Sequence, residues 1–299
     1  MEPPPGAIIP GTMPTVSAQT IERIQAPSRE QLESYVRQNK PVIMTGIADQ
    51  WPAFHKWSPE YLKSVAGEAE IQARYEETGN FHNNLTGELE HRKMTLGELM
   101  DRFTADQPDS NHYLTECPLE GLAPTLLDDV DLSKATTASA ESPLGPPLLF
   151  IGPDASMPLH YHGEREAVLC QLHGSKEVLL FAPDQFSRVY PRRFYQTSFA
   201  FSQVDWHNPD PDRFPKIERA QAIRFTLEPG EILFIPVHWW HYTAVKGLTF
   251  SVTAMWCAKT AQYSYPFPGL QVHARNFVLK MQRLQGRLLG RNVEQPLGC

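Results

Sequence analysis

The chain has 299 residues, of which 41% are hydrophobic, 10% aromatic and 20% charged. This composition is that of a folded globular protein and excludes a disordered chain, and the length suits one large catalytic unit with small flanking parts. The net charge of −7 and the scatter of Lys and Arg argue against a nucleic-acid partner, and the lack of a long apolar stretch argues against a membrane-spanning protein.

The cysteines and the first residues of the chain bear on its compartment. Cys117, Cys170, Cys257 and Cys299 are scattered without a C-x-x-C pair, so we expect buried, reduced thiols and neither a zinc ribbon nor a disulfide framework. The start of the chain is neither basic nor apolar. These features predict a cytoplasmic protein.

Helix and strand signals alternate over the first hundred residues. Residues 1–20 are rich in Pro, Gly and Thr and predict a flexible arm, and Ser28 with Gln31 three residues later predicts the start of a helix. The apolar run 41–46 ends in Gly and predicts a buried strand. Ser58 followed by Pro is typical of a helix start.

The middle of the chain changes character after a second helix signal. We expect a helix over 95–103 and a low-complexity linker or mobile loop over 133–147. Short β-rich runs punctuated by Pro and Gly then follow, at 148–152, 167–173, 177–181, 222–227, 232–235 and 250–255. Many short strands with turn signals predict a sandwich or a barrel.

The last predicted element is a helix over 270–289. Its apolar residues recur with a nearly helical period at 270, 277, 278, 281, 284, 288 and 289. An amphipathic helix at a chain end often serves dimerisation or docking. We therefore divide the chain into an arm (1–20), a catalytic domain (21–269, core about 148–258) and a C-terminal dimerisation element (270–299).

Three histidines form the candidate metal site. His160 and His162 stand two residues apart, and alternate side chains of an extended strand share one face. His241 lies just beyond the apolar strand expected at 232–235, after Pro236 and two Trp. Three neutral nitrogen donors leave coordination positions open for dioxygen or a substrate, as redox iron chemistry needs, whereas a structural zinc site would more often use Cys.

An isolated His-x-His pair is as often an ordinary pair of polar residues, and the segment leading to His241 is what favours a metal site here. Four further histidines are not part of such a motif and are interpreted as ordinary polar residues: His112, His173, His207 and His238. Several Trp and Tyr near the motifs are interpreted as core, and no catalytic residue is assigned beyond the metal ligands.

The sequence resembles the JmjC family of Fe(II)- and 2-oxoglutarate-dependent oxygenases, closest to the asparaginyl hydroxylase type that acts on hypoxia-inducible factor. The likeness extends over roughly 41–289. The segments that carry it are 41–52 (PVIMTGIADQWP), 150–153 (FIGP), 171–176 (QLHGSK), 183–186 (PDQF), 202–205 (SQVD), 208–210 (NPD), 213–215 (RFP) and 236–241 (PVHWWH).

The resemblance implies a mainly β fold with flanking helices, a double-stranded β-helix of the cupin or jelly-roll type. It implies that His160, His162 and His241 bind iron and that Lys176 pairs with the distal carboxylate of 2-oxoglutarate. Tyr113 matches a tyrosine that reaches the same carboxylate, and Thr253 falls where the family commonly has Asn. A solvated Lys176 and a merely packed Tyr113 are the ordinary alternatives.

Three departures leave the cosubstrate open. The family's Asp ligand is replaced by His162, and the usual Thr or Ser three residues before the first His is Met157. One extra residue also lies between the His pair and Gln171. A neutral ligand in place of an anion raises the net positive charge of the metal centre and should change how it binds a dicarboxylate. Glu166, six residues after His160, also fits an older cupin pattern as a fourth ligand, or it is a solvated acid.

The sequence therefore predicts a non-haem Fe(II) oxygenase that uses dioxygen, with 2-oxoglutarate, to hydroxylate a C–H bond of a peptide or protein side chain or of a small molecule. One alternative is a cupin dioxygenase with three His, and Glu166, that uses no oxoacid. The other is a metal-binding or interaction protein without activity. A homodimer through the C-terminal helix is expected, as in the resembling hydroxylase.

Overall fold

Two β-sheets form the centre of the protein. The structure is a computed structural model that describes residues 15–16, 20–77, 81, 90–196, 198–206 and 208–288. Of the arm expected over 1–20, residues 1–14 and 17–19 lie outside the described residues, whereas Thr15–Val16 pairs with the five-stranded sheet as β1.

The five-stranded sheet has the order β1-β11-β10-β13-β8. Its strands are β1 (Thr15–Val16), β11 (Gln221–Leu227), β10 (Lys176–Phe181), β13 (Trp240–Val245) and β8 (Ser156–His160). The nine-stranded sheet has the order β2-β3-β12-β9-β14-β7-β6-β4-β5. Its strands are β2 (Arg23–Gln25), β3 (Val42–Thr45), β12 (Ile232–Ile235), β9 (Arg165–His173), β14 (Thr249–Cys257), β7 (Leu148–Gly152), β6 (His112–Pro118), β4 (Glu70–Tyr75) and β5 (Glu90–Thr95).

Alternation of side chains along the strands divides the core into layers. On β9, Leu169 points between the two sheets, where it meets Val178 of β10, and Val168 points to the outer face of the nine-stranded sheet. On β13, Trp240 and Tyr242 pack on the outer face of the five-stranded sheet. The odd-numbered residues of β13 therefore face the interior, and this parity decides where His241 points.

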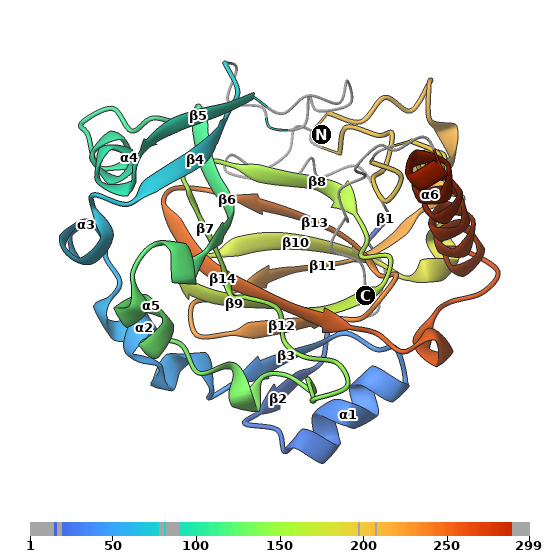
Figure 1. Ribbon diagram of the computed structural model, residues 1–299, viewed down its shortest axis with the longest axis horizontal. Helices are drawn as coiled ribbons and strands as arrows, with labels where there is room; N and C mark the ends of the chain where they lie inside the picture. The colour runs from blue at the N-terminus through green and yellow to red at the C-terminus, as the bar shows by residue number, and fades with distance from the viewer. Residues whose placement is uncertain are drawn as a thin grey trace.

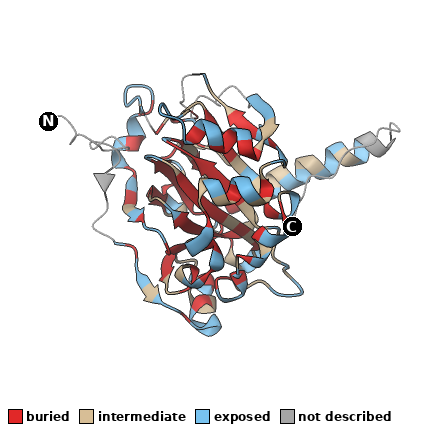
Figure 2. Cartoon of the chain, turned by 90° about the vertical axis from the view of Figure 1, so that its left-hand side faces the viewer, coloured by how far each residue is buried: buried red, intermediate tan, exposed pale blue. Residues whose placement is uncertain are grey.

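Helices cover the outside of the nine-stranded sheet. These are α1 (Arg29–Arg37), α2 (Pro52–Lys56), α3 (Pro59–Ala66), α4 (Leu96–Phe103) and α5 (Pro124–Asp128). Ser28 is the N-cap of α1, where the sequence predicts a helix start. Its hydroxyl accepts from the backbone N–H of Gln31, and the Gln31 side chain accepts from the backbone N–H of Ser28, which together form a capping box. α6 (Gly269–Leu288) extends from the body of the molecule (Figures 1 and 2).

Most of the elements that the sequence predicts are confirmed. The runs 148–152 and 232–235 are β7 and β12, and α4 follows its cap Thr95. The expectation of a linker or mobile loop over 133–147 is wrong, because this segment packs on the rest of the domain. Ala135 is fully buried, and the backbone N–H of Gly145 donates to the Met255 carbonyl oxygen. These contacts make the segment part of the domain.

The thiols are partly as expected. Cys117 and Cys170 are free, and Cys170 is buried, whereas Cys257 is disulfide-bonded, which corrects the expectation of a reduced thiol at that position. Within the part of the chain that the structure describes, no helix combines the length and the apolar character that crossing a bilayer requires.

Candidate metal centre

The three predicted histidines converge between the sheets. One ring nitrogen from each of His160, His162 and His241 lies within 4.8 Å of the others. His160 ends β8, His162 follows two residues later, and His241 lies in β13, opposite His160 in the strand register. His241 lies beyond β12, as the sequence predicts, and belongs to the next strand, β13, which begins at the second Trp of the motif.

Carbonyl groups orient two of the three rings. The Nδ1 of His160 lies 2.8 Å from the Pro158 carbonyl oxygen, and the Nδ1 of His241 lies 3.2 Å from the Trp239 carbonyl oxygen. A carbonyl oxygen only accepts, so each Nδ1 carries the proton and each Nε2 has its lone pair free. This backbone support of the second ring nitrogen is the usual way in which metal-binding histidines are held.

The third ring has an unsatisfied buried nitrogen. The Nδ1 of His162 is buried and has no hydrogen-bond partner. Burial lowers the pKa of His160 to about 4 and that of His162 to about 3, and burial also lowers the pKa of His241, with a further contribution from the two neighbouring rings. All three rings are therefore neutral at neutral pH, which is the form that binds a metal ion.

This donor set fits a divalent transition metal. Imidazole suits Fe(II), Zn(II) and Cu(II), and three donors from β13, the end of β8 and the segment after β8 leave other coordination positions open. The buried, unpartnered nitrogen of His162 is costly unless it meets a ligand.

The other predicted site residues lie around the same small pocket. Its lining includes the three histidines with Lys176, Tyr113, Thr253 and Met157. Lys176 is only 2% exposed, and its Nζ donates to the Ser251 hydroxyl at 2.6 Å. The alternative of a solvated Lys176 is therefore wrong. Burial lowers the pKa of this ammonium group to about 7.

Tyr113 is held beside the pocket by a close approach to Gly152. A Cβ atom on Gly152 would lie 2.5 Å from the Tyr113 ring, so glycine leaves the space that the tyrosine occupies. Tyr113 is buried and packs against Phe150, which also lines the pocket. Burial raises the pKa of its phenol, so Tyr113 is a neutral donor at physiological pH.

Glu166 is not brought to the three histidines. It has the parity of Val168 along β9 and so points away from the interior, and its Oε2 accepts from the backbone N–H of Val237 at 2.8 Å. The alternative of a solvated acid is also wrong, because Glu166 is 1% exposed. Burial raises its pKa to about 8.

Sequence reasoning missed two residues of the site. Ser251, which accepts from Lys176, and Thr243, which lines the pocket, were not singled out. The period of two along each strand is the signal that could have found them, because Ser251 shares the face of Thr253 and Thr243 shares the face of His241. Of the histidines set aside, His238 is fully buried, and His207 lies outside the described residues.

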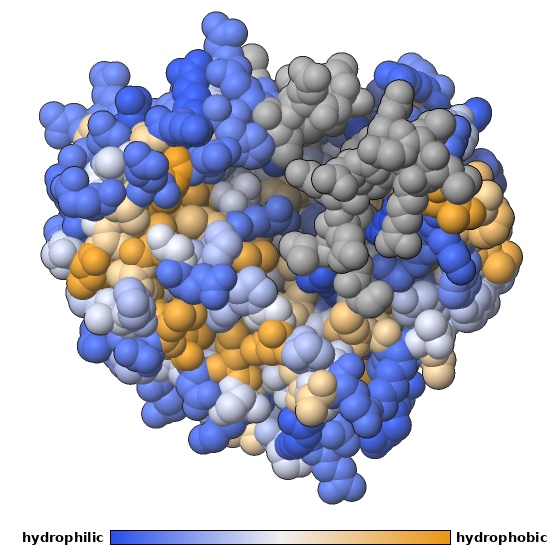
Figure 3. All heavy atoms as spheres, in the orientation of Figure 1, coloured by the Kyte–Doolittle hydropathy of each residue, from blue (hydrophilic) through white to orange (hydrophobic). Residues whose placement is uncertain are grey.

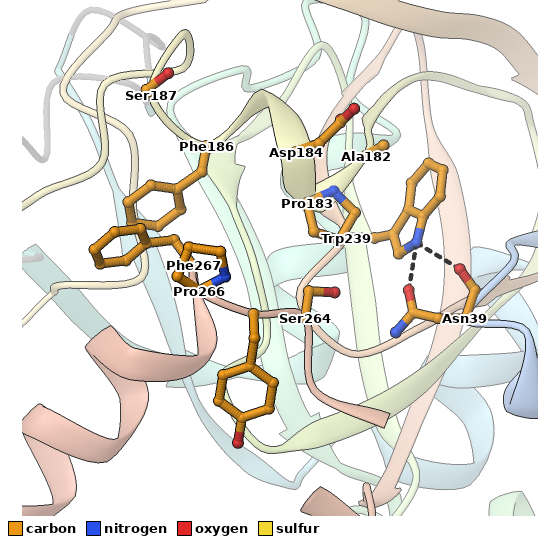
Figure 4. Close-up of a pocket in the computed structure, with 11 residues that line it drawn as sticks. Asn39, Ala182, Pro183, Asp184, Phe186, Ser187, Trp239, Ser264, Pro266 and Phe267 are labelled. Atoms are coloured by element: carbon orange, nitrogen blue, oxygen red, sulfur yellow. Dashed lines mark hydrogen bonds between the residues drawn. The ribbon is translucent and has the colours of Figure 1, made fainter. Parts of the chain in front are cut away.

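A wider groove lies elsewhere on the surface. It has a cavity volume of about 520 Å³ and is lined by residues that include Asn39, Phe186, Trp239 and Phe267 (Figure 4). None of the three histidines lines this groove. The ionisable groups that could support chemistry gather in the smaller pocket.

Comparison with known proteins places the chain in a family. It is 30% identical over 254 residues to a protein named lysine-specific demethylase 8 from Xenopus tropicalis (82% of this chain, 54% of the relative), and 31% identical over 246 residues to one of the same name from Danio rerio (79% and 58%). It is 27% identical over 247 residues to the Jumonji C domain-containing protein 5 of Drosophila melanogaster (79% and 59%).

The chain thus spans little more than half the length of these relatives. Their names support the JmjC resemblance, whereas the expected closeness to an asparaginyl hydroxylase stays a prediction. The family model described as a cupin-like domain matches residues 27–261, a region that contains all three histidines and all strands of the two sheets except β1 and β2. On this match, the chain belongs to the cupin-like domain family.

Proposed function

We propose that this protein is a non-haem Fe(II) oxygenase that uses 2-oxoglutarate to hydroxylate a C–H bond of a peptide or protein side chain. The observation that carries this proposal is the convergence of His160, His162 and His241 within 4.8 Å in a pocket that also contains the buried Lys176. The cupin-like family and the JmjC names of the relatives support the same reaction class.

The three imidazoles would hold the metal through nitrogens that need not lose a proton first. When bound, Fe(II) supplies the redox chemistry that dioxygen activation needs. The pocket is shielded by apolar side chains, among them Leu169, Ile235 and Met255. Such walls exclude bulk water and strengthen every electrostatic interaction within the site.

Lys176 would bind the distal carboxylate of the oxoacid. A buried ammonium group is costly without an anion, and no ion pair to Lys176 occurs among the described residues. Tyr113 and Thr253 line the same pocket. The neutral phenol of Tyr113 would donate to the same carboxylate, and Thr253 would offer a hydroxyl. Together these groups would fix the orientation of the cosubstrate.

A protein or peptide substrate is supported by the relatives, two of which are named for lysine demethylation. Demethylation of this kind would begin with hydroxylation of a methyl C–H bond. Because the chain spans only part of those relatives, a small-molecule substrate stays an alternative.

A second candidate is a dioxygenase that uses three histidines and no oxoacid. The observation that favours it is His162 in place of the family's carboxylate ligand, since three neutral donors leave the full charge of the metal ion uncompensated. In this alternative Glu166 would not act as a ligand, because its carboxylate is bonded to Val237. A metal-binding protein without activity would share the same site.

Anaerobic titration with Fe(II), followed by 2-oxoglutarate, tests the proposal. A metal-to-ligand charge-transfer band that needs both components, and that is lost in His162→Ala and His241→Ala, is expected. Glu166→Ala should still bind iron. Iron binding without the band would favour the oxoacid-independent dioxygenase, and iron binding without turnover of any substrate would favour the inactive protein.

The proposed quaternary structure is a homodimer formed through α6. Large apolar side chains on this helix are exposed: Leu270, Phe277, Met281 and Leu284. Figure 3 shows apolar surface gathered where α6 lies. Exposed apolar patches of this kind often mark protein interfaces. Truncation before Leu270 should yield a monomer in light scattering, and a truncated protein that still runs as a dimer would refute the assignment.

A further inference from the structure

His162 differs from its two partners in what holds its ring. His160 and His241 each have an Nδ1 bonded to a backbone carbonyl, whereas the Nδ1 of His162 has no partner and no hydrogen bond to this ring occurs among the described residues. Contacts with the other two rings and the position of its backbone are therefore what direct the His162 ring. The segment after β8, residues 161–163, is the part of the chain whose position matters.

His238 fixes this segment with two hydrogen bonds. Its backbone N–H donates to the His162 carbonyl oxygen at 3.2 Å, and its Nε2 lies 3.0 Å from the Gly163 carbonyl oxygen. The ring also makes an edge contact with Tyr161, with centroids 5.9 Å apart. All three residues of the 161–163 segment are thus in contact with His238, which is fully buried.

The opposite side of the same ring determines its tautomer. The backbone N–H of Ser264 donates to His238 Nδ1 at 3.0 Å, so Nδ1 is the acceptor and Nε2 must carry the proton that it gives to Gly163. The neutral ring therefore joins the 161–163 segment to the segment that leads into α6. No other protonation state satisfies both bonds.

The backbone of His238 adopts a conformation that disfavours any side chain. Its φ is +71°, in the left-handed region that favours glycine, so a histidine there costs about 1 kcal/mol relative to glycine. The surrounding turn is held on both sides: the Val237 carbonyl accepts from Asn39 Nδ2, and the Trp239 indole donates to Asn39 (Figure 4). This rigid turn leads directly into β13 and His241.

We propose that His238 is a positioning residue that sets the His162 ring relative to His241 by holding the 161–163 segment against the 237–239 turn. The inference rests on the proposed metal site. It assigns to His238 no contact with the metal ion. It predicts that the ring of His238, and not only the shape of the turn, determines how well the three histidines bind a metal.

The experiment compares His238→Gly, His238→Gln and the wild-type protein in anaerobic titrations with Co(II), followed by absorbance. Glycine keeps the left-handed turn but removes both ring bonds, so metal affinity should fall about 10- to 100-fold and the Co(II) bands should change. Glutamine, whose amide can donate to Gly163, should recover part of the affinity. Circular dichroism and the Tm show whether each variant is folded.

Asp154→Gly is the matched control. Asp154, like His238, is a non-glycine residue with a positive φ, and its side chain accepts a hydrogen bond from one backbone N–H. It lies outside the 161–163 segment and the 237–239 turn. Its Co(II) affinity and spectrum should equal those of the wild type. If His238→Gly binds Co(II) as the wild type does, with the same bands, the positioning role is refuted. If the wild type itself does not bind Co(II), the proposed metal site fails instead.

A measurement on the unaltered protein covers the case in which the variants do not fold. Ring ¹⁵N spectra of the histidines should show His238 as a single neutral tautomer protonated at Nε2. A mixture of tautomers at His238 would overturn the proposal, because the ring would then not hold Gly163 and Ser264 at the same time.

Discussion

The ammonium group of Lys176 donates to the hydroxyl of Ser251 at 2.6 Å, and neither side chain is more than 2% exposed. A hydroxyl is a neutral partner, so this bond leaves the positive charge of Lys176 uncompensated. The hydrogen bond thus fixes the ammonium group of Lys176 in the pocket that the histidines line, where it could bind an anion.

Lys176→Met should weaken 2-oxoglutarate binding about 10- to 100-fold, the loss expected for one charge-assisted hydrogen bond, while Fe(II) binding stays unchanged. Because burial lowers the pKa of Lys176 to about 7, the protonated fraction falls as the pH rises, and wild-type affinity for the oxoacid should decline between pH 6 and 8. Titration of the charge-transfer band with 2-oxoglutarate measures the affinity of the variant and the pH dependence of the wild-type affinity. Lys246→Met, at an exposed lysine, is the control.

Gly152→Ala should displace the Tyr113 ring, because the added Cβ would lie 2.5 Å from it. We expect a loss of about 1–3 kcal/mol in the free energy of unfolding and weaker oxoacid binding. Denaturant unfolding and the charge-transfer titration measure these effects. Gly121→Ala, where nothing lies within 4 Å of the added atom, is the control. Unchanged oxoacid binding in Gly152→Ala would argue against a role for Tyr113.

Glu166→Gln should stabilise the protein at alkaline pH. Burial raises the pKa of Glu166 to about 8, so the folded state resists ionisation, and wild-type stability should fall as the pH rises from about 4.5 to about 8. The glutamine keeps an acceptor for the Val237 backbone N–H and removes the pH dependence of stability that Glu166 causes. The free energy of unfolding should therefore rise by roughly 2–4 kcal/mol at pH 8. Glu120→Gln, at an exposed position, should leave the pH profile of the Tm unchanged.

Asp129→Asn should destabilise the helical layer. The buried Asp129 carboxylate accepts from Trp57 at 3.0 Å, Lys56 at 3.0 Å and Tyr61 at 2.9 Å. Burial alone would raise its pKa, but these three donors outweigh that effect and lower it. The free energy of unfolding should fall by about 2–3 kcal/mol near pH 7. This difference from the wild type should shrink as the pH falls below about 4, where the wild-type carboxylate becomes protonated. Urea unfolding at several pH values tests both statements.

The sequence predicted the strands that are apolar throughout and bounded by turn signals. β7 and β12 are of this kind, and their predicted ends match the structure. The run 156–160 was not among the predicted β-rich runs, because it contains Pro158 and few apolar residues, and only the His-x-His spacing indicated an extended strand there. β5 was missed because it is polar along nearly its whole length. An edge strand or a strand end needs no apolar pattern, so its pairing partners decide its structure.

The three histidines were predicted from the spacing and from the resemblance, whereas the direction of Glu166 was not predictable. Glu166 stands in a charged cluster, which is typical of a solvated segment. In the structure it lies in β9 and points to the outer face, so only the register of β9 with its neighbours places it. The role of His238 likewise depends on contacts with two segments distant in the sequence.

His160 and His241 are opposite one another in the pairing of β8 with β13, and the register of this pairing shifts between His241 and Thr243. A slip of one residue would turn an imidazole toward the outer hydrophobic layer and dismantle the triad without altering any ligand. A bound ion would therefore stabilise the pairing of these two strands. Metal loading should slow their separation, so amide hydrogen exchange in β8 and β13 would report occupancy even where no turnover is seen.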